Sequence, residues 1–388
     1  MRKLFLLAIL FITAGAHAGP LEDSGVKGGL IVVIGCDDAK LIAKLARSDK
    51  FLVQALDTDM AKVRKLRETH GKLDSYGRLS AAVFDGKTLP YADNLVNLLI
   101  DSGRIVPSSE VTRVLAPRGV SIIGGKKSVK PVPPDIAEWS HYLYDSKNNA
   151  VSDDKKVSTP TSMQWVSGPR WSRHHDHMSS VSAVVTTNGR IFSILDEGPK
   201  ASIQYPPEWR LVARDAFNGK LLWKRTIDRW HTRIWPAKAG PAQLPRRLVA
   251  VGDKVFATLG LHAPVTVLDA ATGETLKTLA GTEHTEEIIV SDGQLFVTAH
   301  AKAPPEGKWG LKTVQCWTET RRSNTARPWK WEPDDPKKII AIDIASGKIL
   351  WVKETTVAPI TLGADEQRVI YHNGTNVICL DRKSGKES

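Results

Sequence analysis

The 388-residue chain is poor in cysteine, with three in all, and aromatic residues make up only 7% of it. Three cysteines are too few for the disulfide framework that stabilises small secreted domains. Cys36 ends an apolar strand and is expected to be a buried thiol, whereas Cys316 and Cys379 could pair. With 41% hydrophobic and 25% charged residues, the chain has an ordinary globular composition and is long enough for two cores.

Basic residues are in excess but are not concentrated in any segment. The chain carries 54 Lys and Arg against 42 Asp and Glu, and its formal net charge is +12. No run rich in Lys and Arg contains interleaved aromatic residues, so the pattern favours a solvated charged surface over a nucleic-acid site. We therefore expect no nucleic-acid partner.

A long apolar run occurs only within the first 18 residues. Two basic residues and an apolar stretch precede Ala16-His17-Ala18, the small-x-small pattern that a signal peptidase recognises. The run is shorter than the roughly 20 residues needed to span a membrane. Residues 1–18 are therefore predicted to be a secretory signal, whose cleavage removes two positive charges and changes +12 to +10. The mature protein is expected to be periplasmic or secreted, without a transmembrane segment.

The second half of the chain contains an internal repeat. The phrase ARDAFNGKLLW at 213–223 returns as AIDIASGKILW at 341–351, and weaker copies at 267–273 and 379–385 keep the Asp-x-x-x-Gly core. An aspartate that accepts backbone N–H groups, followed by a glycine with positive φ, predicts a hairpin turn. Each copy follows a second hairpin signal with apolar flanks. These signals lie at Asn188-Gly189, Gly252-Asp253, Asp292-Gly293 and Asp365.

Two hairpins in each unit predict a four-stranded blade, and four units predict about four blades. The aspartates of the four copies are separated by 54, 74 and 38 residues, so a unit of about 40 residues carries insertions, the longest around 302–336. Units of this length with four short strands are typical of a β-propeller.

The Ala-x-Asp-x-x-x-Gly-x-x-x-Trp pattern resembles the tryptophan-docking repeat of pyrroloquinoline-quinone (PQQ)-type propellers, over residues 161–388. The resemblance implies that Trp223 and Trp351 dock between blades. Residues 138–149 and 163–165 resemble the entry segment of these propellers, in which a strand from the start completes the last blade. The blades are fewer than the family has, so the propeller is expected to be incomplete and to close with further blades or with a protein partner.

In residues 19–126 the pattern changes to strands alternating with helices, which predicts a parallel sheet covered on both faces, a Rossmann-like unit. We expect strands at 30–34, 51–56, 79–83, 95–100 and 120–123, helices at 39–47, 59–68 and 108–115, and a turn at 117–119. Residues 124–127 are expected to lead into a linker at 128–134.

The loops of this unit resemble those of class I S-adenosylmethionine-dependent methyltransferases. The matching segments, in the family's order, are 33–37, 56–59, 84–94 and 110–119. The resemblance implies that backbone at Gly35 approaches the cofactor, that Asp57 holds the ribose hydroxyls and that Asp85 lies beside the adenine. The residues alone leave open a helix-capping role for Asp57, or for Asp59, and an ordinary Asp-Gly turn at Asp85.

The first loop departs from the family pattern. Where the family has further glycines after Gly35, this chain has Cys36, Asp37, Asp38 and Ala39. These residues place side chains and negative charge where backbone meets the cofactor in the family. The cofactor is also made and kept in the cytosol, whereas this chain is predicted to be exported. We therefore predict a methyltransferase-like domain that has lost catalysis.

A histidine cluster, His174-His175-Asp176-His177, follows the entry segment. Alternate residues of a strand share a face, so a metal would need further ligands, from His231, His262 or His284. We predict a polar packing cluster and no metal site. The vicinal disulfide of the resembling quinone dehydrogenases has no counterpart, because the chain contains no Cys-Cys pair.

The combination resembles large exported proteins of Planctomycetes-like bacteria. We predict a signal peptide at 1–18, an α/β Rossmann-like (methyltransferase-like) domain at 19–126, a linker and entry segment at 127–160, and an all-β, PQQ-like β-propeller at 161–388. The predicted function is that of an exported binding or scaffold protein. The alternatives are an active methyltransferase, which would bind S-adenosylmethionine, and a quinoprotein oxidoreductase, which would bind PQQ and calcium. Catalytic residues and substrate stay open.

Overall fold

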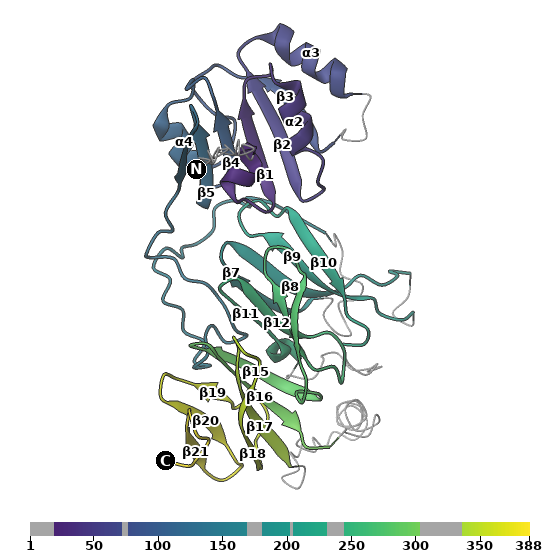
Figure 1. The fold of residues 1–388 in the computed structure, drawn as a ribbon, viewed down its shortest axis with the longest axis vertical. Coiled ribbons are helices and arrows are strands. Elements are labelled where there is room, and N and C mark those ends of the chain that lie inside the picture. The colour runs from purple at the N-terminus through teal and green to yellow at the C-terminus, as the bar shows by residue number, and fades with distance from the viewer. Residues whose placement is uncertain (1–18, 72–76, 169–180, 202–204, 231–243, 303–335) are drawn as a thin grey trace, which may run out of the picture.

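The computed structural model describes residues 19–71, 77–168, 181–201, 205–230, 244–302 and 336–388 (Figure 1). The predicted signal peptide, the histidine cluster at 174–177, His231 and Cys316 lie outside these residues. In the part of the chain that the structure describes, no helix is both long enough and apolar enough to cross a membrane.

The front domain, at the top of Figure 1, is built around a six-stranded sheet with the order β3-β2-β1-β4-β5-β6. Its strands are β1 (Gly29–Ile34), β2 (Phe51–Asp57), β3 (Leu79–Val83), β4 (Val96–Asp101), β5 (Leu115–Ile123) and β6 (Lys126–Val129). Its helices are α1 (Pro20–Ser24), α2 (Ala39–Leu45), α3 (Met60–His70) and α4 (Ser108–Val114). β1 to β5 pair in parallel and β6 is antiparallel.

Apolar side chains cover both faces of this sheet, as predicted. On one face, α2 and α3 pack Ile42 and Val63 against the sheet, and both side chains are fully buried. On the other face, α4 packs Val111 and Val114 against Val32 and Leu99. Burial on two sides explains why the central strands read as continuous apolar runs.

Two details of the predicted domain were wrong. Residues 117–119 form a bulge inside β5 instead of a turn before it, since the pairing with β4 shifts register between Val96 and Leu98. Gly119 permits the close approach, because a Cβ there would lie 2.8 Å from the carbonyl oxygen of Val96. The start of the expected linker is also structured, because Gly124 and Gly125 turn the chain back and residues 126–129 pair with β5 as β6.

The repeat half consists of four antiparallel sheets in chain order, which we call the first to fourth blades (Figure 1). The first contains β7 (Val181–Thr187), β8 (Arg190–Asp196), β9 (Trp209–Asp215) and β10 (Leu221–Thr226), and the second β11 (Leu248–Val251), β12 (Lys254–Thr258), β13 (Val265–Asp269) and β14 (Thr275–Leu279), after a short 3-10 helix at Leu244–Arg247. The third contains β15 (Thr285–Ser291), β16 (Gln294–His300), β17 (Lys337–Asp343) and β18 (Ile349–Thr355). The fourth has three described strands, β19 (Gly363–Ala364), β20 (Arg368–His372) and β21 (Val377–Asp381).

The repeated Asp-x-x-x-Gly turn has the predicted chemistry. In the first blade, the carboxylate of Asp215 accepts hydrogen bonds from the backbone amides of Phe217 (2.9 Å) and Asn218 (3.0 Å). Gly219 follows with φ +71°, and its amide donates to the carbonyl oxygen of Asp215 at 2.9 Å. Glycines of the other three copies have φ of +74°, +77° and +69°. Glycine adopts positive φ without the steric strain of a Cβ atom, and this conformation lets the chain reverse direction at the turn.

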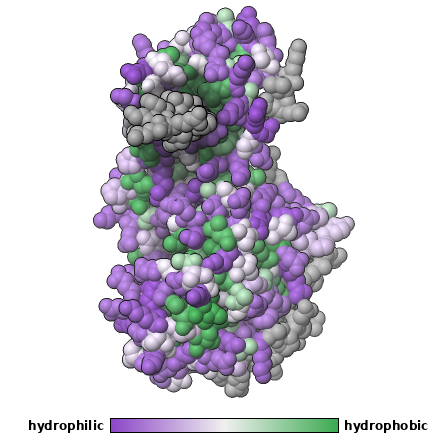
Figure 2. Space-filling model, viewed as in Figure 1, coloured by the Kyte–Doolittle hydropathy of each residue, from purple (hydrophilic) through white to green (hydrophobic). Residues whose placement is uncertain are grey.

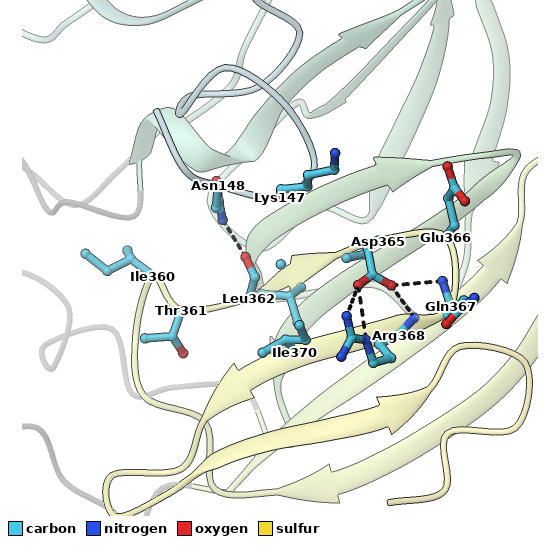
Figure 3. Close-up of a pocket in the computed structure, with 12 residues that line it drawn as sticks. Lys147, Asn148, Ile360, Thr361, Leu362, Asp365, Glu366, Gln367, Arg368 and Ile370 are labelled. Carbon is cyan, nitrogen blue, oxygen red and sulfur yellow. Dashed lines mark hydrogen bonds and ion pairs between the residues drawn. The ribbon is translucent and has the colours of Figure 1, made fainter. Parts of the chain in front are cut away.

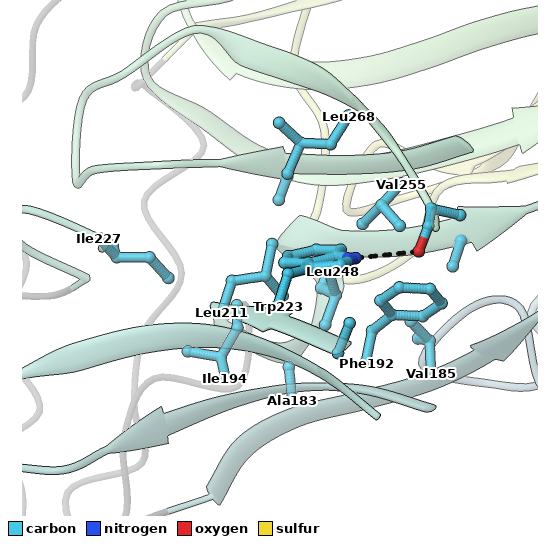
Figure 4. Close-up of a cluster of buried hydrophobic side chains, with 14 of the residues drawn as sticks. Ala183, Val185, Phe192, Ile194, Leu211, Trp223, Ile227, Leu248, Val255 and Leu268 are labelled. Atoms are coloured by element: carbon cyan, nitrogen blue, oxygen red, sulfur yellow. Dashed lines mark hydrogen bonds between the residues drawn. The ribbon is translucent and has the colours of Figure 1, made fainter. Parts of the chain in front are cut away.

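Tryptophan docking between blades is confirmed (Figure 4). The indole N–H of Trp223 donates to the carbonyl oxygen of Ala270 in the second blade at 3.0 Å, and its ring lies against Gly273, where a Cβ would fall 2.6 Å from the ring. Trp351 makes the same contacts with the fourth blade, donating to the carbonyl oxygen of Arg382 at 2.9 Å and lying against Gly385.

Lys277 occupies the same position in the second blade, four residues after the turn glycine. Its Cδ would lie 2.7 Å from a Cβ on Gly347, and its ammonium group donates to the carbonyl oxygen of Ala345 at 3.1 Å. An aliphatic stem and an N–H donor thus replace the indole ring and its N–H. Trp165 of the entry segment docks in this way on the first blade, against Gly219 and the carbonyl oxygen of Ala216 (2.9 Å).

Candidate functional site

The predicted cofactor residues lie where the parallel strands of the front domain end. Gly35 directly follows β1, Asp57 ends β2, and Asp85 follows β3 by two residues. Because these strands are neighbours in the sheet, all three residues lie at one edge. Gly35 has φ +101°, which favours glycine, and its amide donates to the carbonyl oxygen of Leu56 at 2.7 Å.

Asp57 holds the loops at this edge together. One carboxylate oxygen accepts the backbone amide of Cys36 at 2.9 Å, and the other accepts the amide of Asp59 at 2.9 Å. The side chain is only 7% exposed. The capping alternative belongs to Asp59, whose carboxylate accepts the amide of Ala61 at the start of α3 at 2.7 Å. Asp57 therefore fixes the first two loops relative to each other.

Asp85 stabilises its own turn. Its Oδ1 accepts the amides of Lys87 and Thr88, both at 2.7 Å, and these bonds lower the pKa of its carboxyl group. Gly86 follows with φ +75°, and a Cβ there would lie 3.2 Å from Thr58. Asp85 and Gly86 thus form an ordinary, exposed Asp-Gly turn. This turn lies beside the loop that follows β2.

The thiol of Cys36 is buried, as predicted, at the position after Gly35. Burial, with the nearby Asp57 and Asp37 carboxylates, raises the pKa of the thiol to about 11. The thiol is therefore protonated at neutral pH, and a protonated thiol is a poor nucleophile. Asp37 instead faces solvent and forms an ion pair with Lys62 at 2.7 Å.

Asp101, which ends β4, was missed from the sequence. It is fully buried, and one carboxylate oxygen accepts the amide of Val106 at 2.9 Å. The other carboxylate oxygen has no hydrogen-bond partner among the described residues. The available signal was its position, an acid directly after an apolar strand at the same sheet edge as Asp57.

The segment around Glu110 and Arg113 has a structural role. The guanidinium of Arg113 donates to both carboxylate oxygens of Glu110 (2.8 Å each), to Asp93 (2.9 Å) and to the carbonyl oxygens of Leu89 and Tyr91. The Arg113 guanidinium, together with the backbone amide of Leu89, which donates to Glu110 at 2.9 Å, lowers the pKa of Glu110 to about 2. The motif therefore anchors the loop before β4 to α4.

At this sheet edge, the residues expected to contact S-adenosylmethionine make hydrogen bonds within the chain itself. An ionised carboxylate has about four acceptor sites, and two of those on Asp57 are used by backbone amides. Asp37, Asp38 and Ala39 stand where the family has its later glycines, and the Asp85 carboxylate accepts two amides of its own turn.

Among the described residues, no group of three or more metal-ligating side chains comes together. His262 and His284 form a pair, with their Nδ1 atoms 3.0 Å apart. A metal site needs three or four converging ligands, so this pair by itself does not provide one.

A cavity of about 660 Å³ lies between the entry segment and the fourth blade (Figure 3). Its wall includes Asn148, which donates to the carbonyl oxygen of Leu362, and the ion pair of Asp365 with Arg368 at 2.8 Å. Asn148, Asp365 and Arg368 therefore already have hydrogen-bond partners in the wall. Ile360 and Ile370 add apolar surface to the wall.

Comparisons with known proteins give no family assignment. No family model matches the chain, and no curated protein matches it. Among solved structures, BamB from Moraxella catarrhalis is 13% identical over 54% of this chain and 47% of its own, with a TM-score of 0.31. A putative S-adenosyl-L-methionine-dependent methyltransferase from Methanococcus maripaludis is 20% identical over 26% of this chain and 50% of its own (TM-score 0.25), and one from Aquifex aeolicus is 19% identical over 26% and 60% (TM-score 0.25).

The chain spans about half the length of these structures. Its fold follows from its own strand order, namely a mixed, largely parallel sheet with helices on both faces, followed by four antiparallel sheets. The predicted fold class, an α/β domain followed by an all-β half built of antiparallel blades, is confirmed.

Proposed function

We propose that this is an exported binding or scaffold protein, in which the methyltransferase-like domain does not use S-adenosylmethionine and the repeat half presents binding surfaces. The observation that carries the proposal is the bonding of Asp57, each of whose carboxylate oxygens already accepts one backbone amide of the chain itself.

The cost of opening this arrangement supports the loss of cofactor binding. Each backbone amide released from the Asp57 carboxylate forfeits about 0.5–1.5 kcal/mol net, and about 1–3 kcal/mol if the amide stays buried without a partner. Asp37 and Asp38 add carboxylates beside the same loop, and Asp38 caps α2 through the amide of Leu41 at 2.9 Å. A cofactor that displaced either amide would first have to offset these losses.

The surface of the repeat half supports a role in binding other proteins. Figure 2 shows apolar residues gathered in patches on the repeat half of the visible face. The outermost strand of the third blade, β18, exposes Ile349, Leu350 and Val352, and β21 exposes Val377. An apolar strand at a sheet edge can pair with another chain or another sheet. A protein partner or further blades would cover such a surface.

Titration with S-adenosylmethionine tests the proposal. Equilibrium dialysis of the purified protein is expected to show no saturable binding at concentrations up to about 1 mM, because a weaker site contributes less than about 4 kcal/mol. Micromolar binding that is lost in Asp57→Ala, and kept in Asp23→Ala as a matched exposed control on α1, would reverse the conclusion. That result would instead favour the active methyltransferase.

Export is tested separately by the mass of the mature protein. Expressed in a bacterium with its full first segment, the protein is expected to reach the periplasm or the medium with residues 1–18 removed, because this segment has the basic start, short apolar core and Ala-His-Ala end of a signal. Intact-mass spectrometry of the exported fraction measures whether residues 1–18 have been removed. A mass that includes residues 1–18 would refute the export assignment.

A further inference from the structure

A second, polar cavity of about 350 Å³ lies between the front domain and the first two blades. The front domain contributes residues 24–28, Asn97, residues 117–120 and Val129 to its wall, and the blades contribute residues 188–190, Asp215, Phe217, Leu222, Asp253 and Ala271. Ligand sites occur preferentially in such clefts between domains, and cavities of this size accommodate small molecules.

Direct hydrogen bonds between the two parts hold one wall of the cleft in place. The side-chain amide of Asn97 donates to a carboxylate oxygen of Asp215 at 2.6 Å, and Asn218 donates to the Asn97 carbonyl oxygen at 2.7 Å. That oxygen also accepts the backbone amide of Leu30 at 2.8 Å. The start of β1, the start of β4 and the first repeat turn are thus joined, so the cleft is preformed.

Arg190, the first residue of β8, lines this cleft with an unused guanidinium. Among the described residues its guanidinium makes no hydrogen bond, and no carboxylate oxygen lies within 4.0 Å of the guanidinium nitrogens. The carboxylate of Asp215, its cross-strand neighbour, is already taken by Asn97 and by two amides of its own turn. Oδ1 of Asp253 accepts from Asn188 at 3.0 Å. Asp253 and Asp215 therefore influence Arg190 only through space.

Partial burial removes water from this guanidinium, and no hydrogen bond from the described residues replaces that water. Desolvation lowers the pKa of Arg190 despite the through-space attraction of the aspartates. Lys27 and Arg118 also line the cleft, both exposed, and Arg118 forms a 3.7 Å ion pair with Glu138 outside the wall. Basic residues outnumber acidic ones in the wall itself by three to two. Arginine presents five N–H donors in a planar fork that matches the oxygens of a carboxylate or phosphate. Arg190 is half-buried, and a partly desolvated guanidinium without a partner gains from binding an anion.

We propose that this interdomain cleft binds a small oxyanion, a carboxylate or a phosphate, through the guanidinium of Arg190, with Arg118 at the cleft's mouth. The site is separate from the sheet edge at Gly35 and Asp57, because it lies at the opposite ends of β1 and β4. The proposed oxyanion site is therefore independent of whether the sheet edge at Gly35 and Asp57 binds S-adenosylmethionine.

Calorimetric titration of the intact protein tests the site, with inorganic phosphate and succinate as separate probes and with ionic strength held constant by sodium chloride. At least one probe is expected to bind saturably. Arg190→Gln is expected to weaken that binding at least about tenfold, because it removes a charge-assisted bidentate contact. Arg214→Gln is the matched control, since Arg214 is a half-buried arginine on β9 of the same blade, outside the cleft wall. It should leave the affinity unchanged.

Hydrogen exchange locates the bound ion. Phosphate or succinate is expected to slow amide exchange on both sides of the cleft, at residues 24–29 and 186–191. If Arg190→Gln fails to fold, Arg118→Gln in the exposed bulge of β5 should still weaken binding by about threefold. The proposal is overturned if neither probe binds saturably, if folded Arg190→Gln binds as tightly as the parent, if Arg118→Gln has no effect where it is the only folded variant, or if protection maps elsewhere.

Discussion

The contact of Trp223 with Gly273 gives a quantitative prediction for the docking of adjacent blades. Gly273 has φ +74°, and a Cβ on it would lie 2.6 Å and 2.7 Å from two atoms of the indole ring. Gly273→Ala should therefore suffer two penalties, about 1–2 kcal/mol for a side chain in the left-handed region and about 1–3 kcal/mol for overpacking against the ring. Gly252→Ala suffers the first penalty alone, because Gly252 has φ +58° and nothing within 4 Å of its Cβ position.

The free energy of unfolding of the repeat half, followed by native-state hydrogen exchange in β9 and β13 during urea titration, measures both variants. Gly273→Ala is expected to be less stable than Gly252→Ala by about 1–3 kcal/mol. Trp223→Ala should cost about 3–5 kcal/mol, while exchange in the front domain stays at the parent level. In a Trp223→Ala background the indole ring is absent. Adding Gly273→Ala to that background should therefore lower the free energy of unfolding by no more than Gly252→Ala does. Equal costs for the two glycine variants in the parent background would refute the docking contact.

Two further predictions concern the position equivalent to the docking tryptophan and the buried histidine of the entry segment. Lys277→Trp should stabilise the contact with Gly347 by about 1 kcal/mol, because an indole buries more apolar area than a lysine stem; a lower urea midpoint than the parent would contradict this. The His141 imidazole accepts the amide of Val290 at 3.0 Å, and burial lowers its pKa to about 3. The unfolded chain then binds the extra proton below the ordinary pKa of about 6.5, so stability should fall by about 1.4 kcal/mol for each pH unit between 6.5 and 3, about 2.7 kcal/mol at pH 4.5. Urea titrations at pH 7 and 4.5 should show a smaller loss for His141→Gln, and an equal loss would exclude His141 as the cause.

The repeat turns could be predicted because their determinants are local. Asp215 and Gly219 lie four residues apart, and the carboxylate and the positive φ act within that span. The docking role of Lys277 also depends on a local feature, its position four residues after a turn glycine. The docking repeat is usually recognised by its tryptophan, which this copy lacks. Position relative to the glycine would have revealed it.

The roles of Asp57 and Arg190 could not be predicted, because they depend on distances that no local pattern encodes. Asp57 reaches the amide of Cys36, 21 residues earlier in the chain. The cleft that Arg190 lines exists only because Asn97 of the front domain bonds to Asp215, 118 residues later. An acid after a strand, or an arginine beside a hairpin, looks the same in the sequence whether or not such a partner exists.

The first repeat turn joins three parts of the molecule, which has a consequence for how this protein can evolve. Asn218 donates to the carbonyl oxygen of Leu95 and to Asn97 in the front domain, while Gln164 of the entry segment donates to the carbonyl oxygen of Phe217 at 2.9 Å. Thr272, in the corresponding position of the second copy, makes no such connection among the described residues. In homologues that keep this domain pairing, position 218 should therefore drift more slowly than position 272, although both belong to the same repeat.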